Sequence, residues 1–162
     1  MDFKGKNVLI TGGSREIGYA TAAEFVKSGA RVVIIGRDEV QLSRAAESIG
    51  AYALKWDIAD ISIREKKLNH AYALSKYAIR GLTTGLGKAM APYGIYVNAV
   101  APGPCTTTIL GYEDGEVHKD GSPYGRHALP IEIAKVIKFI ASEDSGTMVG
   151  QTVIVDGGET LV

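Results

Sequence analysis

Short apolar runs alternate with amphipathic stretches along this chain of 162 residues, and the alternation predicts its secondary structure. The apolar runs end at Gly, Pro or Asp residues, as buried strands commonly do. Between them, apolar residues recur at intervals of three and four, which is the period of a helix. The predicted strands cover residues 7–10, 31–35, 52–56, 95–101 and 151–155, and the predicted helices cover residues 17–26, 39–49, 63–91 and 130–140.

This succession of strands and helices predicts an α/β fold. Strands that are apolar throughout are typical of a parallel sheet whose two faces are covered. Right-handed crossovers then give a doubly wound parallel sheet of about five strands, most simply in the order 3-2-1-4-5. Ligands bind such sheets beyond the carboxyl ends of the strands, where the strand order reverses. We therefore expect the site at residues 11–18 and 101–108.

The composition and charge of the chain exclude several classes of partner and site. With 18 basic and 18 acidic residues, the net charge of zero gives no electrostatic basis for nucleic-acid or membrane partners. The single cysteine, Cys105, excludes an intrachain disulfide and suits a reducing compartment. His70, His118 and His127 lack the spacing of metal ligands. The lack of a signal-like or membrane-spanning apolar stretch adds to the expectation of one soluble, cytoplasmic domain over residues 1–162, without a metal site.

A glycine-rich turn at residues 11–18 follows the first predicted strand and opens the first predicted helix. Backbone N–H groups and the positive end of a helix dipole bind anions at such a place, although a tight turn alone would also use these glycines. The second strand ends at Gly36 and Arg37, where dinucleotide-binding folds often carry an acidic residue for the ribose 2′-hydroxyl. Arg37 and Arg15 instead favour a 2′-phosphate, hence NADP over NAD, unless both are simply surface arginines.

Tyr72 and Lys76 are four residues apart in the long predicted helix and share one of its faces. An ammonium group near a phenol lowers the phenol's pKa, which makes the phenol a usable proton donor and acceptor. An ordinary pair on a helix surface has the same spacing.

Five motifs in a characteristic order connect these features, and together they resemble the short-chain dehydrogenase/reductase family from one end of the chain to the other. The motifs are Thr11-Gly12-x-x-x-x-Ile17-Gly18, Asp57-Ile58, Tyr72-x-x-x-Lys76, Tyr93-Gly94-Ile95-x-Val97-Asn98-x-Val100-x-Pro102-Gly103 and Gly150-Gln151-x-x-x-Val155-Asp156-Gly157-Gly158.

This resemblance implies a Rossmann-like fold and an NADP(H)-dependent oxidoreductase that transfers hydride between the nicotinamide and a small carbonyl compound or secondary alcohol. Tyr72 would exchange the proton, and Lys76 would lower its pKa and hold the nicotinamide ribose. Asp57 would bind the adenine and Thr107 the carboxamide, while residues 104–128 would resemble the substrate loop. The expected cofactor-binding residues are Gly12, Ser14, Arg15, Ile17, Gly18, Arg37, Asp57, Lys76, Pro102, Gly103 and Thr107.

The chain also departs from the family pattern. Two βα units that the family places between Asp57 and Tyr72 are missing, and the catalytic Asn and Ser that they carry are not found. Ser62 is the nearest hydroxyl, and we interpret it as a helix N-cap. Glu16 replaces a family glycine and brings a Cβ atom and a negative charge close to the pyrophosphate.

The missing units leave two structural outcomes and more than one function open. Either a gap separates the first and fourth strands and exposes two edges, or the Tyr72 helix shifts by about 10 Å. The chain is then an active reductase, a catalytically impaired relic that acts at most as a nucleotide-binding or oligomeric interaction module, or an internally deleted version, natural or engineered, of a longer enzyme. A homo-oligomer is a possible assembly.

Overall fold

The computed structural model describes residues 2–56, 69–107, 117–119 and 121–161, and within residues 69–75 it describes the backbone only. Short 3₁₀ helices, η1 (Ala91–Tyr93) and η3 (Glu143–Ser145), follow α3 and α4. The main elements are β1 (Asn7–Thr11), α1 (Glu16–Lys27), β2 (Arg31–Gly36), α2 (Glu39–Ile49), β3 (Tyr52–Lys55), α3 (Asn69–Met90), β4 (Ala99–Pro102), α4 (Pro130–Ile140) and β5 (Thr152–Val155).

The predicted order of strands and helices is confirmed, and local signals set several of their ends. The Asp38 carboxylate caps α2 by accepting a hydrogen bond from the Gln41 N–H at 3.0 Å. Gly50 ends the same helix with φ +74°, a left-handed conformation that favours glycine. The strand predicted over residues 95–101 is shorter in the structure, since β4 begins at Ala99. Just before it, the side-chain oxygen of Asn98 accepts the Gln151 N–H, in place of a backbone carbonyl of a longer strand pair.

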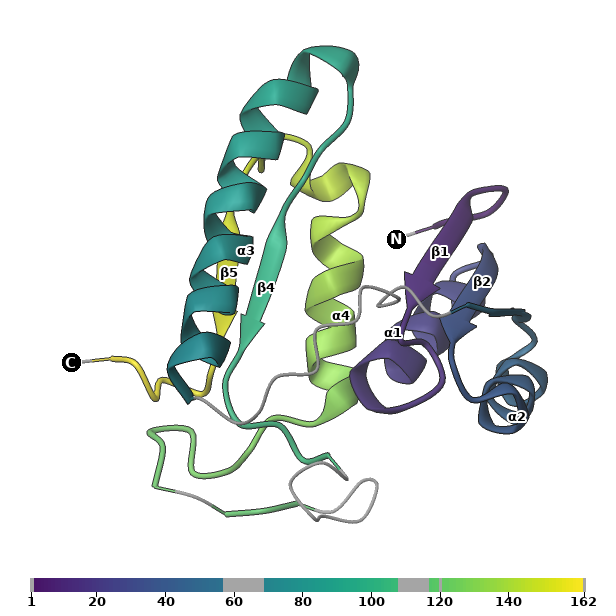
Figure 1. Ribbon diagram of the computed structural model, residues 1–162, viewed down its shortest axis with the longest axis horizontal. Coiled ribbons are helices and arrows are strands. Elements are labelled where there is room, and N and C mark those ends of the chain that lie inside the picture. The colour runs from purple at the N-terminus through teal and green to yellow at the C-terminus, as the bar shows by residue number, and fades with distance from the viewer. Residues whose placement is uncertain (1, 57–68, 108–116, 120, 162) are drawn as a thin grey trace.

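The strands form two parallel sheets, β1-β2-β3 and β4-β5. Both parts of the predicted order 3-2-1-4-5 are present, but among the described residues β1 does not pair with β4. Helix α4 lies between α1 and the β4–β5 pair (Figure 1), and it packs extensively on α1.

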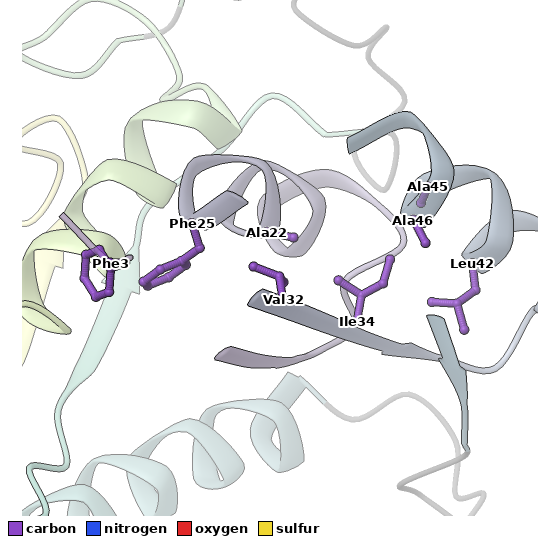
Figure 2. Packing of buried hydrophobic residues seen from close by; sticks show 8 residues of the cluster. All are labelled: Phe3, Ala22, Phe25, Val32, Ile34, Leu42, Ala45 and Ala46. Atoms are coloured by element: carbon purple, nitrogen blue, oxygen red, sulfur yellow. The ribbon is translucent and has the colours of Figure 1, made fainter. Parts of the chain in front are cut away.

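The main core lies between the β1–β3 sheet and the helices α1 and α2. The Phe3 and Phe25 rings meet edge to face with their centroids 4.8 Å apart. Val32 and Ile34 of β2 point toward α1, and Leu42 of α2 closes the far end (Figure 2). The buried cluster consists of Phe3, Ala22, Phe25, Val32, Ile34, Leu42, Ala45 and Ala46.

The opposite face of this sheet is open in the described part of the chain. Leu9 of β1 is 62% exposed, and Trp56, just beyond β3, is 60% exposed. Tyr52 at the start of β3 is exposed as well, because no described helix covers this face as parallel sheets require. Helix α3 likewise presents an exposed apolar stripe at helical spacing, formed by Ile79, Leu82 and Leu86.

Candidate functional site

The turn between β1 and α1 needs its glycines for steric reasons. Gly12 has φ +69°, and its N–H donates to the Ile35 carbonyl at 2.9 Å. A Cβ atom on Gly13 would lie 2.6 Å from the Ile34 side chain, and one on Gly18 would collide with the Gly12 carbonyl. These contacts bring the turn, the sheet and the start of α1 together closely.

The first turn of α1 is open to an anion. Its N-cap residue, Arg15, makes no side-chain hydrogen bond to the helix. The first N–H groups of a helix have no partner within it and carry the positive end of the helix dipole. The turn therefore fits the phosphate groups of a dinucleotide, the ligand class that the sequence predicts.

Glu16 occupies a backbone conformation that favours glycine. Its φ of +51° is the only positive φ of a non-glycine residue in the described part of the chain. The departure from the family pattern is therefore conformational as well as electrostatic.

A cavity of about 420 Å³ lies beside this turn. It brings together three predicted residues, Ser14 and Arg15 from the turn and Thr107 from the segment after β4. The prediction that residues 11–18 and 101–108 meet at one site agrees with this arrangement. The lining residues are Ser14, Arg15, Glu16, Tyr19, Gln41, Arg44, Ala45, Ser48, Thr106 and Thr107.

The α2 residues of this cavity were missed in the sequence, although a signal for them was present. Gln41, Arg44 and Ser48 follow each other at three- and four-residue intervals, which places them on one face of the helix. Thr106 was also missed. Its N–H donates to the Ala128 carbonyl at 2.8 Å, and its side chain is only 1% exposed.

Other predicted residues lie away from the cavity lining. Arg37 is exposed at the end of β2, and Lys76 is exposed on α3. Gly103, next to Pro102, donates its N–H to the Val155 carbonyl at 3.0 Å, and a Cβ atom there would lie 2.8 Å from Asp156. Ile17 and Gly18 lie in the first turn of α1.

Two predicted residues bear on the chemistry but fall partly or wholly outside what the structure describes. Tyr72 belongs to the N-terminal part of α3, and its side chain lies outside the described residues. Asp57 lies outside them entirely, as does Ser62.

The described end of the 104–128 segment is tied to α4 by an ion pair. Arg126 donates two hydrogen bonds to the Glu132 carboxylate, at 2.6 and 2.9 Å, and its guanidinium lies 4.7 Å from the centre of the Tyr124 ring. Glu132 also accepts the Leu129 N–H at 2.8 Å, as a helix cap. The Arg126 hydrogen bonds lower the pKa of Glu132 to about 2.

Cys105 lies next to this ion pair but is not a reactive thiol. The side chain is buried, and its strand-like backbone bridges to Ala128. Burial, followed by the charges of Glu16 and Glu132, raises the pKa of the Cys105 thiol to about 11. The thiol therefore stays protonated near neutral pH.

Comparison with known proteins identifies the family. Residues 61–160 match the family profile described as enoyl-(acyl carrier protein) reductase, and residues 6–70 match that described as short chain dehydrogenase. The chain belongs to the short-chain dehydrogenase/reductase family. None of the helices described for this short-chain dehydrogenase/reductase is long and apolar enough to cross a membrane.

Its curated relatives are longer than the chain. It is 43% identical over 98 residues to a short-chain dehydrogenase/reductase of Armillaria gallica, an alignment that covers 54% of this chain and 38% of that protein. It is 37% identical over 102 residues to L-2,3-butanediol dehydrogenase of Corynebacterium glutamicum, covering 54% of this chain and 40% of that enzyme. These alignments thus span about two fifths of the relatives' length. A longer alignment, at 26% identity over 246 positions, covers 99% of this chain and 99% of the 2,3-dihydro-2,3-dihydroxybenzoate dehydrogenase of Escherichia coli K12.

Solved structures confirm the Rossmann-like α/β fold of this short-chain dehydrogenase/reductase. A structure titled as a short chain dehydrogenase/reductase family protein is 25% identical, with a TM-score of 0.83 and full coverage of both chains. The crystal structure of BdcA in complex with NADPH has the same identity and TM-score, and the match covers 96% of this chain and 95% of that one.

Proposed function

We propose that the chain is an NADP(H)-dependent oxidoreductase that acts on a small carbonyl compound or secondary alcohol. The observation that carries this proposal is the meeting of the open α1 N-terminus, Arg15 and Thr107 at one cavity. Two relatives are named as dehydrogenases of 2,3-butanediol and of 2,3-dihydro-2,3-dihydroxybenzoate, which agrees with an alcohol as the reduced substrate. The NADPH in the BdcA structure agrees with the cofactor.

The residues present fit a dinucleotide in the following way. The N–H groups at the start of α1 would bind the pyrophosphate, with Ser14 and Arg15 at its side. Asp57 would bind the adenine and Thr107 the carboxamide. When bound, the nicotinamide supplies or accepts the hydride.

Proton transfer would belong to Tyr72. In the direction of reduction, its phenol donates a proton to the substrate oxygen, and in the direction of oxidation the phenolate takes it back. Lys76 lies one helical turn further along α3, where its ammonium would favour the phenolate and hold the ribose.

Titration with NADPH, followed by the change in its fluorescence, tests the nucleotide site. We expect saturable binding that NADP competes for. An absence of binding at millimolar NADPH would contradict the proposed function.

A second candidate is a nucleotide-binding or self-associating module without turnover. The exposed Leu9 on β1 and the apolar stripe on α3 favour it, since uncovered apolar surface promotes association. The absence of the catalytic Asn and Ser in the motif positions favours it too. NADPH binding without oxidation of NADPH by a panel of aldehydes and ketones would support this module and exclude the reductase.

A further inference from the structure

We propose that the outer edge of β1 binds an extended, apolar segment of another protein chain, which adds to the sheet as a parallel strand. The segment carries a basic residue at its N-terminal end. Three features of the molecule point to this partner: unpaired backbone groups along β1, a hollow beside them, and the charges around that hollow. The interaction requires neither the cofactor nor the reaction proposed above.

One edge of β1 has no strand partner in the described part of the chain, where β1 pairs with β2 alone. The Lys6 carbonyl accepts the Arg31 N–H of β2 at 2.9 Å. Since alternate residues of a strand direct their N–H and C=O groups to opposite sides, the groups of Asn7, Leu9 and Thr11 point away from β2. Such an edge is a template on which a strand of another chain can form hydrogen bonds.

A hollow of about 630 Å³ lies beside the N-terminal part of β1. Residues 7–9 line one part of it, and residues 141–144, which follow α4, line another. Phe3 and Phe25, the two rings that meet edge to face in the core (Figure 2), also line it. Free backbone groups next to apolar side chains suit an extended segment rather than a helix, because a helix has already bonded its own backbone groups.

The surroundings of the hollow indicate the direction of the added strand. A second hollow, of about 420 Å³, shares residues 141–143 with the first and reaches Tyr96, which precedes β4. The arrows of β1 and β4 point the same way in Figure 1, and all strand pairs among the described residues are parallel. A strand that runs parallel to β1 therefore matches both neighbouring sheets.

The charges at the larger hollow favour a basic group. Asp2, Glu143 and Asp144 line it, and among the described lining residues Lys6 is the one cation. Lys6 Nζ lies 3.8 Å from Glu143 Oε1, and both side chains are exposed, so this contact is weak and leaves negative charge in excess. These residues surround the N-terminal end of β1. A parallel strand brings its own N-terminal end there, where a Lys or Arg would meet the carboxylates.

A synthetic peptide of residues 30–37 is the probe, because it contains the sequence of β2, which already pairs in parallel with β1. The acetylated peptide carries fluorescein at its C-terminus, and its anisotropy is measured as the folded chain is added without cofactor. We expect saturable binding to one site.

Two methylated versions of the peptide distinguish strand pairing from apolar adhesion. One is N-methylated on the backbone at Val32 and Ile34, and the other at Val33 and Ile35. Only one of these sets directs its N–H groups to β1. We expect that version to bind about tenfold more weakly or worse, and the other to bind within about threefold of the unmodified peptide.

Variants of the chain test the charges. Glu143→Lys should weaken the peptide about fivefold at low ionic strength. Glu47→Lys is the matched control, because Glu47 is an exposed residue of α2 outside the hollow, and it should change the affinity less than twofold. A peptide with Arg31→Glu should reverse the order and bind the Glu143→Lys chain more tightly than the parent. Circular dichroism checks that each variant is folded.

The outcomes decide between the proposal and its alternatives. No binding at millimolar peptide, or equal binding of the two methylated peptides, would overturn strand addition at β1. An unchanged affinity in Glu143→Lys would overturn the basic N-terminal end. If the peptide lowers the mass of the parent on a sizing column, the proposal is supported and the natural segment belongs to a second copy of the chain. If the peptide binds a parent of single-chain mass, the proposal is supported and the segment belongs to a different protein. A chain that binds NADPH but not the peptide would retain the proposed function.

Discussion

Glu24 of α1 accepts a hydrogen bond from Lys138 of α4, with Oε2 and Nζ 2.8 Å apart. Lys138 Nζ also donates to Ser28 Oγ at 3.3 Å, and Lys27 lies 3.6 Å from the other oxygen of Glu24. The Lys138 hydrogen bond lowers the pKa of Glu24 despite the opposing effect of burial. This contact joins the half of the molecule built on β1–β3 to the half built on β4–β5. Among the described residues, no strand of one half pairs with a strand of the other.

Neutralising Glu24 should weaken the contact between α1 and α4 and so lower the stability of the fold. In Glu24→Gln, Lys138 keeps its charge in a largely buried place, so we expect unfolding to cost about 2 kcal/mol less. Urea denaturation followed by circular dichroism measures the difference. Glu39→Gln is the control, because Glu39 pairs with Lys55 at 2.7 Å on the exposed surface and should change little. Equal losses in both variants would argue against the linking role of Glu24.

Glu16→Gly should stabilise the chain. Glycine takes the φ of +51° without the steric cost that glutamate has there, which is of the order of 1 kcal/mol. The same substitution at Glu47, within α2, should destabilise the chain by about 1 kcal/mol, because glycine is a poor helix former. Thermal unfolding of both variants measures whether each substitution raises or lowers the stability of the fold. A loss of stability in Glu16→Gly would show that its side-chain contacts outweigh the backbone strain.

Stability should fall in acid through Glu132. Because Arg126 lowers the pKa of Glu132 from 4.5 to about 2 in the folded chain, its contribution is complete above about pH 4.5 and is lost as the pH falls toward 2. Glu132→Gln should therefore be less stable than the parent at pH 7, and the difference should shrink by pH 3. Urea midpoints across this range measure it. A difference that stays constant with pH would contradict the assignment.

Tyr72→Phe should abolish reduction of a generic ketone while leaving NADPH binding within about twofold, since only the proton donor is lost. The initial rate of NADPH oxidation at saturating cofactor is the measurement. Tyr77→Phe is the matched control, because Tyr77 lies on the same helix and is 73% exposed. Unchanged activity in Tyr72→Phe would show that another group transfers the proton.

Self-association, which remains a proposal, should depend on the apolar stripe of α3. Light scattering on a sizing column should give a mass above that of one chain, and Leu82→Lys should lower it, because a charge in a buried contact is unfavourable. Val40→Lys, an exposed apolar position on α2, serves as the control. A single-chain mass for the parent would exclude the homo-oligomer.

Local features of this chain were determined by the sequence itself. The Asp38 cap, the Gly50 helix end and the glycine turn after β1 each depend on residues within a few positions of one another, so short-range chemistry is sufficient to set them. The five motifs in order likewise led to the family, and with it to the Rossmann-like fold. The helical spacing of Gln41, Arg44 and Ser48 places Arg44 on one face of α2 with them. The sequence does not show which other segment of the chain lies against that face.

Tertiary structure decided what segments distant in the chain do together. Packing of α1 on α4 brings Glu24 to Lys138 across more than one hundred residues. In the described part of the chain, β1 does not pair with β4, and one face of the β1–β3 sheet is open. It also places Thr106 and Arg44 at the cavity that Arg15 borders, while Arg37 lies outside its lining. The spacing of apolar residues in the sequence shows which face of a helix or strand is apolar. Which other element packs on that face depends on how the helices and sheets are arranged in three dimensions.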